Sequence, residues 1–101
     1  MPWTLDKNGA NFKNWERLND TEKGNWDTFQ NAVANEGVHP AEAASRLGTV
    51  AHKARADYKC LAGDQFQIRL SGSHRATFRV MENARDKTSG VVQVLEVGGH
   101  T

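Results

Sequence analysis

The sequence has few cysteines, few prolines and no long apolar run. Its 101 residues include 1 Cys and 2 Pro. The single thiol, Cys60, excludes an intramolecular disulfide and favours a reducing compartment. No apolar run approaches the roughly 18 to 20 residues that a membrane-spanning helix needs, and the N-terminal MPWTLDKNG lacks the basic start and apolar core of a secretory signal. We therefore expect a cytoplasmic protein with no membrane partner.

A strong excess of one charge is also missing. The 13 basic and 12 acidic residues leave a formal net charge of +1, so any nucleic-acid footprint must be local. The 4 histidines and the cysteine show none of the short paired spacings of zinc sites, and no glycine-rich phosphate loop precedes a helix. We expect no metal and no cofactor, and assign no role to His39 and His52.

The first half of the chain has the periodicity of helices. Three apolar residues recur at intervals of three: Phe12, Trp15 and Leu18. This spacing predicts a short helix from about Asn11, and a second helix is predicted over residues 21–36, ended by Gly37. These two helices are expected to form an antiparallel hairpin. His39-Pro40 opens a third, shorter helical piece.

The second half changes to a period of two, which is typical of strands. Strands are predicted over residues 58–61, 66–70, 76–80 and 91–97, and Trp3 to Leu5 is either a short first strand or an extended arm. The fold class is therefore α+β, with an N-terminal helical hairpin packed on a three- to four-stranded antiparallel sheet. At this length, residues 1–101 are expected to form a single domain.

The central hairpin, FQIRLSGSHRATFRV from Phe66 to Val80, carries arginines on one face and apolar residues on the other. A three-residue loop over residues 71–73 pairs Ile68 with Ala76 and keeps both apolar. The same register sets Arg69 across from Arg75. Two like charges in that position are unfavourable unless an anion or an acidic partner lies over them, although long arginines can also extend into solvent.

These residues resemble the RelE/ParE toxin superfamily of bacterial toxin–antitoxin systems. The matching segments are Phe12-x-x-Trp15-x-x-Leu18, Phe66 to Leu70, His74 to Val80, and Val94 to His100. The resemblance covers the chain from about Phe12 to its end and rests on the order and spacing of short motifs. It implies a RelE/ParE-like fold and a small cytoplasmic toxin that a cognate antitoxin holds inactive.

Two activities are implied by this resemblance. RelE-like members cleave mRNA on the ribosome without a metal, whereas ParE-like members poison DNA gyrase, and a relative with decayed activity is a third alternative. Carried over by position, Arg69, Arg75 and His100 are the expected catalytic residues. The expected RNA-binding residues are Lys59, Gln67, His74, Arg79, Lys53 and Arg55. Gln67 departs from the lysine or arginine of the family, and the chain stops at Thr101, before the segment that carries the RelE tyrosine.

The chemistry of metal-independent RNA cleavage assigns roles to some of these residues. The reaction needs a base for the 2′-hydroxyl, cations for the phosphorane-like oxygens and an acid for the leaving 5′-oxygen. Arg69 and Arg75 suit the cationic role, because guanidinium groups grip phosphate oxygens bidentately. A histidine suits proton transfer. Strand parity places His74 on the apolar side or in the loop, which makes His100 the better candidate.

Overall fold

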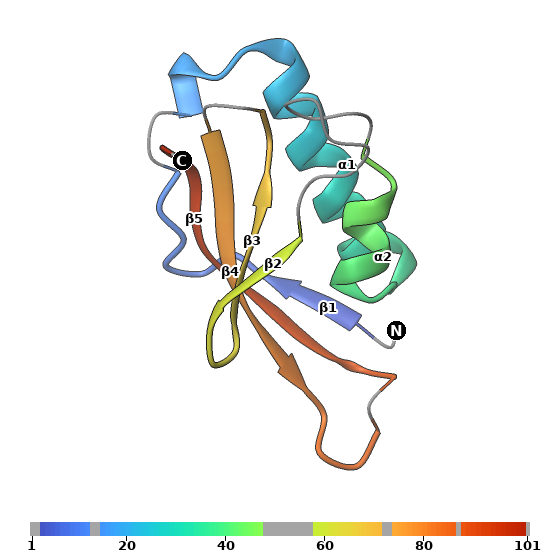
Figure 1. Cartoon of the computed structure of the whole chain (residues 1–101). Helices are drawn as coiled ribbons and strands as arrows, with labels where there is room; N and C mark the ends of the chain where they lie inside the picture. Colours follow the sequence, from blue (N-terminus) through green and yellow to red (C-terminus); the bar gives the residue numbers. More distant parts are fainter. Residues whose placement is uncertain (1–2, 13–14, 48–57, 72–73, 87, 101) are drawn as a thin grey trace.

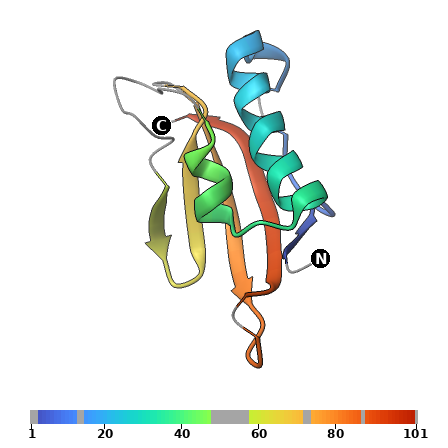
Figure 2. The same cartoon turned by 90° about the vertical axis from the view of Figure 1, so that its right-hand side faces the viewer.

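The computed structural model describes residues 3–12, 15–47, 58–71, 74–86 and 88–100. Within these ranges the chain is α+β, with two helices on one face of a five-stranded sheet (Figures 1 and 2). The helices are α1 (Asp20–Glu36) and α2 (Pro40–Ser45). The strands are β1 (Trp3–Asp6), β2 (Lys59–Ala62), β3 (Gln65–Arg69), β4 (His74–Glu82) and β5 (Gly90–His100). Their spatial order is β1-β5-β4-β3-β2.

The sheet differs from the predicted one in strand number and direction. The meander β2 to β5 is antiparallel, as expected, but β1 adds a fifth strand that runs parallel to β5, with Trp3 paired with Gly90 and Asp6 with Gln93. This pairing joins the two ends of the chain across both helices. A contact of such sequence separation leaves no trace in local periodicity, which explains why the sequence predicted a purely antiparallel sheet.

The predicted first helix is wrong. Residues 15–17 form only a 3₁₀ turn, and Asn11 instead makes a parallel bridge with Glu96 of β5. The exact interval of three between the apolar residues matches the 3.0 residues per turn of a 3₁₀ helix better than the 3.6 of an α-helix. Leu18 is buried, but Phe12 is 38% exposed. The helix pair on the sheet is therefore α1 with α2.

Helix α1 confirms the second predicted helix. Asn19 caps it, because its side chain accepts from the backbone N–H of Glu22 while the Glu22 carboxylate accepts from the N–H of Asn19. This reciprocal pair is a capping box, which satisfies two N–H groups that the first turn leaves unpaired. Gly37 ends the helix in the left-handed conformation at φ 68°, as predicted.

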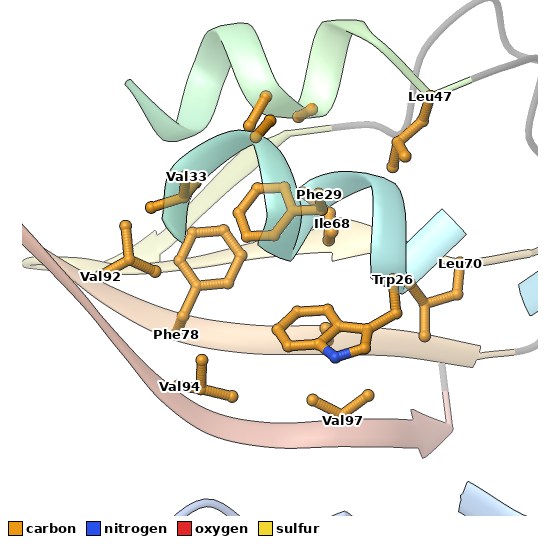
Figure 3. Packing of buried hydrophobic residues seen from close by; sticks show 14 of the residues in the cluster. Trp26, Phe29, Val33, Leu47, Ile68, Leu70, Phe78, Val92, Val94 and Val97 are labelled. Carbon is orange, nitrogen blue, oxygen red and sulfur yellow. The ribbon is translucent and has the colours of Figure 1, made fainter. Parts of the chain in front are cut away.

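Helix α2 confirms the third helical piece. Its N-cap is His39, whose Nδ1 accepts a hydrogen bond of 3.0 Å from the N–H of Ala41, and Pro40 occupies the first turn. Both helices press apolar side chains onto the sheet (Figure 3). The ring centroids of Phe29 and Phe78 lie 5.0 Å apart, and both side chains are fully buried. Burial of such apolar surface is the main contribution to stability.

The central hairpin has the predicted register. Phe66 pairs with Phe78, Ile68 with Ala76, and Arg69 with Arg75. Residues 72–73 of the connection lie outside the described residues, but the N–H of Leu70 bonds the carbonyl of His74 and extends the ladder. Since directly opposed residues share a face, this register places the two arginines together on the face opposite the helices.

Candidate functional site

Polar and cationic side chains form rows across the sheet on the face that the two helices leave open. One row runs through Lys59, Gln67, Thr77 and Glu96, on four successive strands. The next row contains Arg69, Arg75 and Gly99, and the row on the other side of Gln67 contains Gln65, Arg79 and Gln93. We call these three rows the open face. The predicted residues Lys59, Gln67, Arg69, Arg75 and Arg79 all lie on it.

Arg75 is held in place by Gln67. Its Nη1 donates a hydrogen bond of 2.8 Å to Oε1 of Gln67, a side chain that is only 5% exposed although it lies on the open face. The Nε of Arg75 is buried and has no hydrogen-bond partner among the described residues. Buried N–H donors are nearly always paired in folded proteins. Arg75 is therefore oriented by the protein with one donor still to be satisfied.

Arg69 lies directly across the β3–β4 ladder from Arg75. Both side chains are partly buried, so their like charges are less screened than on a fully solvated surface. An oxyanion over this pair would accept charge-assisted hydrogen bonds from the guanidinium donors. The arrangement can therefore bind a phosphate group.

Arg79 is engaged by an acidic side chain from the β2–β3 connection. Its Nε and Nη2 donate to the carboxylate of Asp64 at 3.2 and 2.8 Å. These hydrogen bonds lower the pKa of Asp64 and raise that of Arg79. The charge of Arg79 is thus largely balanced within the protein, which reduces the contribution to RNA binding that the sequence predicted for it.

His74 lies on the helix side of the sheet, as strand parity predicted, and not beside the arginines. Its Nδ1 is 2.7 Å from Oε2 of Glu22 in α1. The Ser71 hydroxyl donates to the same oxygen at 2.5 Å, and Oε1 accepts from the N–H of Asn19 at 2.9 Å. The predicted RNA-binding role of His74 therefore does not fit its placement, because the side chain is directed to a buried carboxylate.

The pKa of Glu22 is lowered despite its burial. It is only 4% exposed, and burial alone raises the pKa of its carboxyl group. Hydrogen bonds from Ser71, the Asn19 N–H and His74 outweigh that effect and bring its pKa below the ordinary value. Sequence reasoning missed this residue. The signal was the Asn-x-x-Glu spacing of a capping box, which places Glu22 but does not reveal its partners 49 and 52 residues away.

Glu96 is the second residue that sequence reasoning missed. It belongs to the open face, opposite Thr77. Its Oε1 occupies the space that a Cβ atom on Gly99 would take. Irregular pairing of β4 and β5 at residues 75–78 changes which β5 residues face outward, and such a bulge is not visible in simple alternation.

The remaining predicted residues are placed only in part. His100 ends β5, where it is the Cα partner of His74. Lys53 and Arg55 lie outside the described residues. No three His, Cys, Asp or Glu side chains in the described ranges are grouped so that they could hold a metal ion.

The sequence matches no protein-family model, and no curated protein matches it at a significant level. None of the helices in the described part of the chain is both long and apolar enough to cross a membrane.

Proposed function

We propose that this chain is the toxin of a toxin–antitoxin system, with a RelE/ParE-like fold and a metal-independent, ribosome-dependent mRNA endoribonuclease activity. The sequence resemblance supports the family, and the arrangement of helices ahead of an antiparallel meander fits it. The proposed partners are a cognate antitoxin, the ribosome and mRNA, in the cytoplasm. Fold alone does not define an activity, so we propose the nuclease activity from the residues of the open face.

The observation that carries the proposal is the Arg69–Arg75 pair. Arg75 is oriented by Gln67, and a second guanidinium lies directly opposite across the β3–β4 ladder. Donors fixed before the substrate arrives stabilise developing negative charge without reorganisation. In this proposal the two arginines hold the scissile phosphate and stabilise the phosphorane-like transition state. Lys59 contacts a flanking phosphate, and water protonates the leaving oxygen.

The direct test uses purified protein and ribosomes programmed with a defined mRNA. We expect cleavage in the presence of the wild-type protein, mapped by primer extension, and a loss of about 10²- to 10³-fold in rate for Arg75→Ala, the magnitude typical of removing one oxyanion donor. Arg85→Ala is the matched control, because Arg85 is exposed in the β4–β5 connection, away from the open face. Intact mRNA with the wild-type protein would contradict the nuclease proposal.

A second candidate is a non-enzymatic module of the same fold, either a ParE-like gyrase inhibitor or a catalytically decayed relative. Two observations favour it. Gln67 replaces the expected cation and serves to hold Arg75, and His74 is directed to Glu22 on the other face. A DNA supercoiling assay separates the candidates: intact mRNA together with inhibited gyrase supports the ParE-like alternative, and inactivity in both assays supports the decayed relative.

A further inference from the structure

We infer that Glu96 is the general base that removes the proton from the attacking 2′-hydroxyl group. This inference rests on the proposed nuclease function and names the group that the function leaves unassigned. The sequence predicted cations for the phosphate and a histidine for proton transfer, and it left open which residue acts as the base. The structure places a carboxylate on the same face as the two arginines.

The position of Glu96 follows from the strand register. Gly99 pairs with Arg75 across the β4–β5 ladder, and Arg75 pairs in turn with Arg69. Since opposed residues share a face, a Cβ atom on Gly99 would point to the open face beside Arg75. The Oε1 of Glu96 occupies that space. The carboxylate is therefore folded along β5 into the row of the two arginines.

Gly99 makes this placement possible. The φ angle of Gly99 is not among the positive values found at other glycines, so the backbone itself does not require glycine here. What the missing side chain provides is room for the Glu96 carboxylate. Any larger residue at position 99 would displace it from the arginine row.

Glu96 also differs in its hydrogen bonding from two other carboxylates near the sheet. Asp64 is bound by Arg79, and Glu22 accepts hydrogen bonds on both oxygens. Glu96, by contrast, has no hydrogen bond or ion pair within the described residues. A general base needs an accessible lone pair and a position within hydrogen-bond reach of the proton that it removes, and Glu96 is only partly buried.

The step that this geometry allows is an in-line transesterification. One carboxylate oxygen of Glu96 takes the proton of the 2′-hydroxyl, and the O2′–P bond forms while the P–O5′ bond breaks. The arginines stabilise the charge on the phosphoryl oxygens, and the leaving O5′ takes a proton from water. The products are a 2′,3′-cyclic phosphate and a 5′-hydroxyl end. Glu96 returns its proton to water, so no metal or other co-reactant is consumed.

Three variants test the assignment in the programmed-ribosome assay under single-turnover conditions. Glu96→Gln should lower the cleavage rate about 10²- to 10⁴-fold, the usual contribution of a general base, with RNA affinity retained because the arginines remain. Gly99→Ala should give a similar loss although Glu96 is still present, because the new methyl group displaces the carboxylate. Glu82→Gln, an exposed acidic residue at the far end of β4, should cleave like the wild type.

Chemical rescue separates proton transfer from charge balance. Removing the side chain in Glu96→Ala leaves space beside Gly99, so added formate should restore part of the cleavage rate in this variant and none in Arg75→Ala. Circular dichroism and urea unfolding check that each variant is folded. If the wild type cleaves and both Glu96→Gln and Gly99→Ala cleave at the same rate, the assignment of Glu96 is overturned and the nuclease function stands. Absence of cleavage by the wild type would overturn the nuclease function and the assignment with it.

Discussion

The Nδ1 atom of His74 lies 2.7 Å from Oε2 of Glu22, a residue 52 positions earlier in the chain. This contact fastens the start of β4 to the first turn of α1. The same carboxylate also receives the Ser71 hydroxyl at the end of the preceding strand. One buried side chain therefore caps a helix and anchors both sides of the β3–β4 connection to it, at the end of the hairpin that carries Arg69 and Arg75.

We predict that Glu22→Gln lowers the free energy of unfolding by about 1 to 3 kcal/mol, the usual effect of leaving buried polar groups badly paired. The amide oxygen of glutamine can still accept on one side, but its NH₂ group only donates and accepts from none of the present donors on the other. Urea denaturation measures the loss. Glu42→Gln is the control, since Glu42 is exposed in the first turn of α2 and should change little. Equal stability of the two variants would contradict the anchoring role.

The lowered pKa of Glu22 also predicts a dependence of stability on pH. The unfolded protein binds more protons than the folded protein between the folded pKa and the unfolded value of about 4.3. The stabilisation from Glu22 is therefore complete above about pH 4.3 and is lost as pH falls through the lower folded pKa. Unfolding free energies measured from pH 6 downwards should fall less steeply in Glu22→Gln. Identical slopes for both proteins would rule this contribution out.

Replacing two glycines by alanine is expected to change the stability of the protein in opposite directions. A Cβ atom on Gly90 would collide with the backbone oxygen of Met81 and lie 2.7 Å from the ring of buried Trp3. Gly90→Ala should therefore destabilise the protein by about 1 to 3 kcal/mol, as overpacking does. Gly24, on the exposed side of α1, has nothing within 4 Å of such an atom.

Gly24→Ala serves as the matched change and should stabilise the protein by about 0.5 to 1 kcal/mol, because alanine is the better helix former. Thermal or urea unfolding of both variants provides the comparison. A neutral result for Gly90→Ala would mean that β1 and β5 can separate without cost, against the close packing of Trp3 on β5.

The Asp64–Arg79 pair predicts an effect on RNA binding. Asp64→Asn removes the charge that balances Arg79 and adds one available cation to the open face. Affinity for a single-stranded RNA should rise, and the slope of log K against log salt should steepen by about 0.7, the change expected for one more phosphate contact on a single strand. Fluorescence anisotropy at several salt concentrations measures both. Asp27→Asn, on the exposed side of α1, should leave the slope unchanged.

Features that depend on neighbours in the chain were predictable from the sequence alone. The helical periodicity of residues 21–36 and the terminating Gly37 defined α1 closely, because both signals are local in the sequence. The register of the central hairpin followed from alternation and loop length. These two local signals were enough to place Arg69 opposite Arg75, since a shift of the strand register by one residue would have exposed the apolar side chains of the hairpin.

Contacts across long sequence distances were decided by the tertiary structure. The parallel pairing of β1 with β5, the turning of His74 towards Glu22 and the outward position of Glu96 opposite Thr77 each depend on segments that meet only after folding. Local periodicity carries no record of such partners. The arginine pair was therefore predictable from the sequence, whereas the outward position of Glu96 emerged only once the irregular β4–β5 pairing had set which side chains face outward.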